Sequence, residues 1–111
     1  MVDAAVVEAV RRYVGVLRRD HGLDVDRAVV FGSYAKGNSD EWSDIDLVVV
    51  ARKFDGTFSR DDVSLLWRVA SHTDSRIEPI PCGVRQWDED QSSAIIEIAR
   101  REGEVVLPDA A

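Results

Sequence analysis

The sequence predicts an α/β domain (α+β), in which helices pack on a small mixed β-sheet of about four strands. An amphipathic segment comes first, and two short apolar runs then flank a polar loop. Two further amphipathic segments follow, each leading to another apolar run. We therefore expect the order helix, strand, turn, strand, helix, strand, helix, strand.

The first expected element is a helix over residues 4–19. Apolar side chains recur there at steps of three and four, which is the period of one helix face; they are Val6, Val7, Val10, Tyr13, Val14 and Leu17. Asp3 is suited to the N-cap because its short carboxylate can accept from a free backbone N–H. Gly22 follows the expected end.

Two strands are expected next, at about 27–31 and at 45–51. The stretch 32–37 between them predicts a turn with at most one helical turn, and 38–43 is a polar loop. The run 45–51 is continuously apolar and rich in β-branched residues, which is typical of a strand buried on both faces.

The next segment predicts a loop at 54–59, a helix at 61–72 and a third strand at about 76–80. Pro79 and Pro81 cannot donate to a β-ladder, so this strand is expected to end or to lie near a sheet edge.

The remainder of the chain predicts a third helix over about 90–102 and a short final strand at 104–107. Gly103 is suited to the helix C-cap.

Composition restricts the function. A chain of 111 residues is expected to form one domain, residues 1–111. The net charge of −7 argues against direct binding of a nucleic acid. With Cys82 as the single cysteine, no intrachain disulfide is possible, and we expect a small, buried or half-buried side chain that does not act as a nucleophile. No apolar run is long enough for a membrane span or a signal peptide, so we expect a cytoplasmic protein.

Gly32 and Ser33 follow the first strand and open a turn. Free backbone N–H groups in such a turn bind phosphate oxygens, and glycine lets a ligand approach closely. The Ser33 hydroxyl can add a hydrogen bond. Lys36 is a candidate phosphate contact, although an exposed loop lysine is an equally good interpretation. Tyr34, Trp42 and Trp87 are interpreted as packing residues rather than as the lining of a nucleotide or partner surface.

Asp44 and Asp46 stand at the entrance to the second strand. Residues two apart in a strand point to the same face, so both carboxylates are expected to project together. Like charges about 4 Å apart repel by roughly 4 kcal/mol at an effective dielectric constant of 20. A Mg²⁺ ion would relieve this repulsion and could also hold a triphosphate. The ordinary alternative is a solvated Ser-Asp cap.

The stretch from Val30 to Val49 resembles the nucleotidyltransferase superfamily of the DNA polymerase β type. It contains Gly32-Ser33, ten intervening residues and Asp44-Ile45-Asp46. More narrowly, this signature resembles the minimal nucleotidyltransferases (MNT proteins), and the short chain fits that branch. The resemblance implies a polymerase β-like nucleotidyltransferase core and two Mg²⁺ ions.

The resemblance also implies a third carboxylate on a later strand, which binds metal and helps to activate the acceptor hydroxyl. Glu78 is the best candidate because its segment is the only later one that is typical of a central strand. Asp74 is the alternative, and an ordinary edge-strand charge is another interpretation of Glu78.

The resemblance further implies transfer of AMP from ATP to a hydroxyl, with release of pyrophosphate. MNT proteins resemble antitoxins of HEPN-type RNase toxins, so the expected acceptor is a toxin tyrosine. Two alternatives stay open. One is an antitoxin that masks its partner without turnover, and the other is a nucleotidyltransferase that acts on a small molecule.

Overall fold

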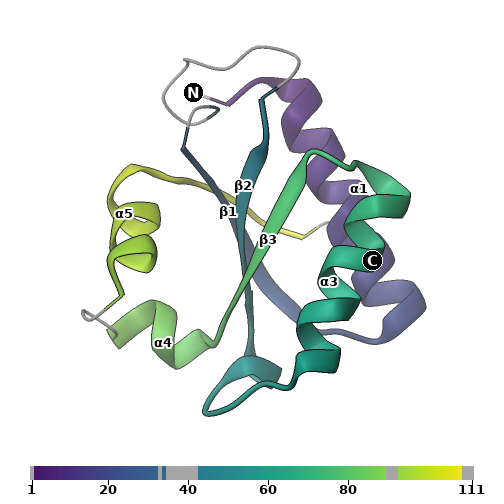
Figure 1. The fold of residues 1–111 in the computed structure, drawn as a ribbon. Coiled ribbons are helices and arrows are strands. Elements are labelled where there is room, and N and C mark those ends of the chain that lie inside the picture. The colour runs from purple at the N-terminus through teal and green to yellow at the C-terminus, as the bar shows by residue number, and fades with distance from the viewer. Residues whose placement is uncertain (1, 33, 35–42, 90–92, 109–111) are drawn as a thin grey trace.

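The computed structural model describes residues 2–32, 34, 43–89 and 93–108. In this part of the chain, four strands form one mixed sheet in the order β3-β2-β1-β4 (Figure 1). Their bounds are β1 (Val25–Phe31), β2 (Ile45–Ala51), β3 (Ile77–Cys82) and β4 (Glu104–Val106). β1 is antiparallel to both β2 and β4, whereas β3 is parallel to β2. The predicted mixed sheet with packed helices is confirmed.

Helices cover both faces of the sheet (Figure 1). α1 (Ala4–His21) and α3 (Arg60–Thr73) pack on one face, and α4 (Val84–Glu89) and α5 (Ala94–Glu102) lie on the other. A short 3₁₀ helix, η1 (Arg52–Phe54), follows β2 and ends where the predicted loop over 54–59 begins. None of the helices in the described part of the chain has the length and apolarity needed to cross a bilayer.

Alternating side chains of β2 enter two separate cores, as the predicted burial on both faces requires. The first core lies toward α1 and α3, and it includes Val10, Tyr13, Leu17, Val30, Ile45, Leu47, Val49, Leu66 and Ile77. The second core lies toward α4 and α5 and consists of Val29, Val48, Val50, Cys82, Trp87, Ile96 and Ala99. Packing of Trp87 and burial of Cys82 are therefore confirmed.

The ends of α1 and α3 follow from local sequence. Asp3 Oδ1 accepts from the Ala5 backbone N–H at 3.0 Å, and Gly22 closes α1 in the left-handed conformation with φ 65°. Ser59 and Asp62 form a reciprocal capping box at the start of α3, with distances of 2.9 and 3.2 Å. Such caps satisfy backbone N–H groups that the helix leaves free.

The predicted helix over 90–102 is wrong at its start. Its C-terminal part is α5, whereas the separate α4 precedes it and residues 90–92 lie outside the described part. α4 has only six residues, too few to show a helical period, and Trp87 is its buried side chain. β3 continues through both prolines to Cys82, which an edge strand permits because its outer N–H groups have no ladder partner.

A buried hydrogen bond joins α1 to α3. Tyr13 is fully buried and its hydroxyl donates to the Leu66 carbonyl at 2.9 Å. Burial raises the pKa of Tyr13 far above its ordinary value, so the donor is always protonated. The two helices that cover the first core are thereby fixed to each other.

We predict that Tyr13→Phe lowers the free energy of unfolding by about 1 kcal/mol, because it removes this hydrogen bond and keeps the ring. Tyr13→Ala should cost about 3–5 kcal/mol, because it also leaves a cavity. Urea denaturation measures both. Equal stability of the Phe variant and the parent would contradict a net contribution from the hydroxyl.

Candidate active site

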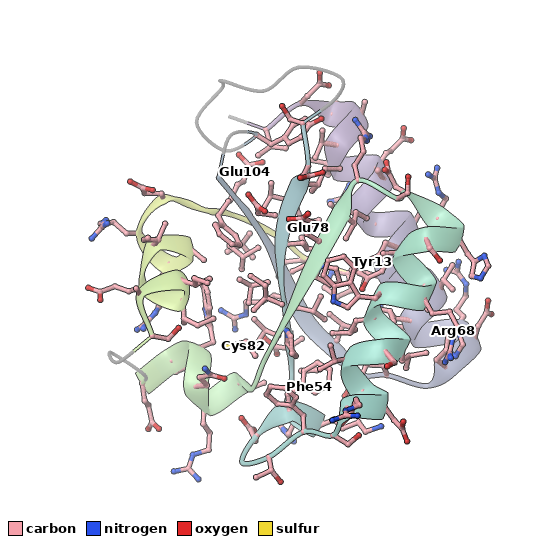
Figure 2. All side chains as sticks on the ribbon, in the orientation of Figure 1. Tyr13, Phe54, Arg68, Glu78, Cys82 and Glu104 are labelled. Carbon is pink, nitrogen blue, oxygen red and sulfur yellow. The ribbon has the colours of Figure 1, made fainter. Side chains whose placement is uncertain are left out.

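The candidate site lies where β1 ends and where β2 and β3 begin. Phe31 at the end of β1 pairs with Asp46 of β2, and Asp46 pairs with Glu78 of β3. Register partners in neighbouring strands point to the same face, so the Asp46 and Glu78 side chains project together. Figure 2 shows Glu78 on the part of β3 that is distant from α4.

Three carboxyl groups meet at this end of the sheet. The Glu78 carboxyl lies within hydrogen-bonding reach of the carboxyls of both Asp44 and Asp46. Asp44 is exposed and directly precedes β2, whereas Asp46 and Glu78 are half-buried. The structure therefore brings together the three predicted carboxylates. Their roles stay predictions.

Burial and repulsion between neighbouring charges make Asp46 and Glu78 harder to ionise. Burial raises the pKa of Asp46, and the charge of Asp44 raises it further, while the hydrogen bond with Glu78 opposes both effects. Burial also raises the pKa of Glu78, and the charges and hydrogen bonds of the two aspartates add to this increase. Asp46 and Glu78 therefore hold a proton to a higher pH than isolated carboxyl groups do.

Gly32 contacts the cluster directly. Its φ of 76° is left-handed, and a Cβ built there would overlap Asp46 Oδ2. Glycine is therefore required for two reasons, the backbone conformation and the close approach of the carboxylate. Two residues that the sequence predicted from separate motifs thus lie side by side.

Asp74, the alternative third carboxylate, binds Arg76 instead. Its Oδ1 accepts from Arg76 Nε at 3.0 Å and from the Arg76 backbone N–H at 3.0 Å, and its Oδ2 accepts from Nη2 at 2.7 Å. This pairing holds the pKa of Asp74 below its ordinary value. The geometry therefore favours Glu78 over Asp74. The interpretation of the Glu78 segment as a central strand is wrong, because β3 is an edge strand next to central β2.

Arg76 is a site residue that the sequence analysis missed. Its Nη1 donates to the Tyr34 hydroxyl at 3.0 Å, and its guanidinium carbon lies 5.9 Å from the centre of the Tyr34 ring. Tyr34 is buried in the first core, so its interpretation as a packing residue is confirmed. No local pattern connects the two residues, which are 42 positions apart.

Ser33, Lys36 and Trp42 lie outside the described residues. The phosphate contacts of Ser33 and Lys36 therefore stay predictions. Gly32 and Tyr34, the sequence neighbours of Ser33, are both described.

The donor set suits a hard divalent cation. Carboxylate oxygens are the ligands that Mg²⁺ prefers, and a cation would offset the repulsion within the cluster. Among the described residues, no group of three or more His, Cys, Asp and Glu side chains has the geometry of a finished metal site. The Glu78 carboxyl contacts those of Asp44 and Asp46 instead, so we expect metal binding to require a small separation of the side chains.

Clustered carboxylates beside a glycine turn on a mixed sheet are the features that the sequence motif predicted for a nucleotidyltransferase. Residues 10–105 match the nucleotidyltransferase domain family. The chain belongs to this family, as the resemblance of its motif predicted. No curated protein matches the chain.

Solved structures share the fold. A protein of Sulfolobus solfataricus assigned as a nucleotidyltransferase superimposes with a TM-score of 0.64 at 15% identity, over 89% of this chain and 77% of that chain. A toxin–antitoxin structure with AMP-PNP gives 0.59 at 22% identity, over 89% and 73%. A tri-AMPylated Shewanella oneidensis HEPN toxin in complex with its MNT antitoxin gives 0.54 at 20% identity, over 93% and 73%.

We predict that Gly32→Ala destabilises the protein more than Gly56→Ala. Both glycines have a left-handed φ, 76° and 79°, which costs an alanine about 1–2 kcal/mol. Only Gly32 has a neighbour that the new methyl group would meet, so Gly32→Ala should cost about 1–3 kcal/mol more. Urea denaturation measures the difference, and in an Asp46→Ala background it should disappear. An equal cost at both positions would refute the close contact with Asp46.

We also predict that Glu78→Gln raises the melting temperature at pH 7 by a few degrees. The pKa values of Glu78 and Asp46 are higher in the folded protein than in the unfolded chain, where they are near 4. The folded state is therefore most stable below about pH 4 and loses stability as the pH rises through the pKa values of the folded state. Mg²⁺ should raise the melting temperature of the parent more than that of the variant. Thermal scans from pH 4 to 8 measure both effects.

Asp62→Ala is the control of opposite sign. The hydrogen bonds of the Asp62 carboxylate at the helix cap lower its pKa. Asp62 therefore stabilises the folded protein above about pH 4, and this stabilisation is lost in acid. This variant should be less stable than the parent at pH 7. The assignment of a strained carboxyl cluster fails if Glu78→Gln behaves in the same way.

Proposed function

We propose that this chain transfers AMP from ATP to a hydroxyl of a partner protein. The observation that carries the proposal is the meeting of Glu78 with Asp44 and Asp46 beside Gly32, in a chain that belongs to the nucleotidyltransferase domain family. Clustered carboxylates next to a phosphate-binding turn are suited to phosphoryl-type transfer, in which positioning and charge neutralisation supply most of the catalysis.

In the proposed reaction, the acceptor oxygen attacks the α-phosphorus and the bond to the leaving pyrophosphate breaks. In this proposal Glu78 receives the acceptor proton, because a carboxylate next to the reacting hydroxyl can act as a general base. Asp44, Asp46 and Glu78 would hold Mg²⁺, which when bound neutralises the phosphate charge. The turn at Gly32, with Ser33 and Lys36, would hold the triphosphate.

The acceptor that we propose is a tyrosine of a HEPN-type RNase toxin, and the chain would act as its antitoxin. The exposure of Asp44 supports this proposal, because a side chain of another protein can reach an exposed carboxyl group. The fold is shared with an MNT antitoxin in complex with a tri-AMPylated HEPN toxin. The net charge of −7 is suited to a basic partner, as an RNA-binding enzyme would be.

The test is incubation with a candidate HEPN-type partner, labelled ATP and Mg²⁺, followed by mass spectrometry of the partner. We expect one or more AMP groups on a partner tyrosine. Asp44→Asn and Asp46→Asn should abolish the transfer, whereas Asp26→Asn, on the surface at the far end of β1, should retain it. A tight complex without labelling, unaffected by the site variants, would instead establish an antitoxin that masks its partner.

We predict that Glu78→Gln lowers the transfer rate by about 10²–10⁴-fold, because the amide can neither accept the proton nor bind metal as a carboxylate does. Nucleotide binding should stay measurable by calorimetry. Glu104→Gln is the matched control, because Glu104 lies on β4 at the opposite edge of the sheet and accepts from the Val2 backbone N–H. Full activity of Glu78→Gln would overturn the assignment.

A further inference from the structure

Arg76 connects the segments that form the candidate site. Its backbone carbonyl accepts a hydrogen bond from the Ile45 N–H at 2.8 Å. Ile45 lies between Asp44 and Asp46 in the sequence. Its guanidinium reaches Tyr34, and Glu78 stands two residues further along the chain. One residue therefore touches the start of β2, precedes β3 and contacts the turn that follows β1.

Asp74 holds the Arg76 side chain in one orientation. The pair is bidentate, with a distance of 2.7 Å between Nη2 and Oδ2, and the side chains are 34% and 13% exposed. A planar guanidinium held on one edge by a carboxylate presents its remaining N–H groups in a fixed direction. In Arg76 that remaining group is Nη1, which faces the Tyr34 hydroxyl.

Two neighbours of Ser33 are anchored in this way. Tyr34 is only 7% exposed, and its hydroxyl accepts from Arg76. Gly32 lies against the Asp46 carboxylate. Ser33, which we expect to bind phosphate, therefore stands in the sequence between Gly32, which contacts β2, and Tyr34, which contacts Arg76 just before β3.

We propose that Arg76 is a positioning residue for nucleotide binding, which acts through Tyr34 to hold Gly32 and Tyr34 in fixed positions relative to Asp46 and Glu78. This inference rests on the proposed function. Arg76 needs no contact with substrate for this role. Lysine cannot replace it, because a single ammonium group cannot bind Asp74 at two points and also donate to Tyr34 in a fixed geometry.

The first experiment measures affinity for a non-hydrolysable ATP analogue with Mg²⁺, and steady-state kinetics of transfer. Arg76→Lys should weaken binding and raise KM for ATP by about tenfold, with kcat changed much less. Tyr34→Phe keeps the ring and the Arg76–Asp74 pair but removes the acceptor, so it should weaken binding by a smaller factor. The double variant should resemble Arg76→Lys alone, because both changes break one connection.

Arg27→Lys is the matched control. Arg27 pairs with Asp26 at 2.7 Å at the far end of β1, so the same exchange there removes an Arg–Asp pair without touching the turn. It should leave nucleotide affinity unchanged. The proposal is overturned if Arg76→Lys lowers thermal stability but leaves affinity unchanged, or if the effects of Arg76→Lys and Tyr34→Phe simply add.

A second experiment needs no nucleotide and therefore separates this inference from the proposed function. Amide hydrogen exchange at Gly32 and Tyr34 should become about tenfold faster in Arg76→Lys than in the parent, while exchange at Val48 in central β2 stays unchanged. Unchanged exchange at Tyr34 would refute the positioning role even if the protein transfers AMP. Faster exchange in a protein that neither binds nor transfers nucleotide would refute the proposed function and, with it, the role of Arg76 in nucleotide binding.

Discussion

The register of β2 against its two neighbours is the constraint on which the candidate site depends. Because side chains alternate along a strand, a slip of one residue would turn Asp46 into the first core and Leu47 away from it. Leu47 and Val49 fill one core while Val48 and Val50 fill the other, all of them fully buried, so a slip would force both cores to repack and would bury the Asp46 carboxylate. Packing in the middle of the strand therefore fixes the carboxylate at its end.

The carboxyl cluster destabilises the folded state, whereas the two hydrophobic cores stabilise it. Three carboxyls within mutual reach raise the free energy of the folded state, and burial of large aliphatic side chains on both faces of β2 offsets this at about 1.5–3 kcal/mol per residue. A site that is unfavourable on its own can persist only where the surrounding structure determines it strongly. A bound cation would relieve the repulsion among the carboxylates, so the feature that destabilises the site on its own also favours binding of the metal that the proposed reaction needs.

Local patterns in the sequence were sufficient for part of this structure. Periodicity gave α1 and α3, and the two prolines indicated that β3 lies near an edge. Asp44, Asp46 and Gly32 could be selected because each belongs to a short motif, whereas Glu78 came from a family resemblance. α4 was missed because six residues show no period, and the Arg76–Tyr34 contact was missed because only the fold brings β3 near the turn.

The location of the cluster also follows from a difference in length. α5 has nine residues and so spans about 14 Å, whereas the seven residues of β2 span about 23 Å. Trp87 of α4 and Ile96 of α5 cover Val48 and Val50, which are the later residues of β2 on that face. Asp46 is the first residue of β2 on the same face and stays only half-buried. α4 and α5 are thus too short to cover the whole face, and the carboxylates of β2 and β3 meet at the end of the face that these two helices do not reach.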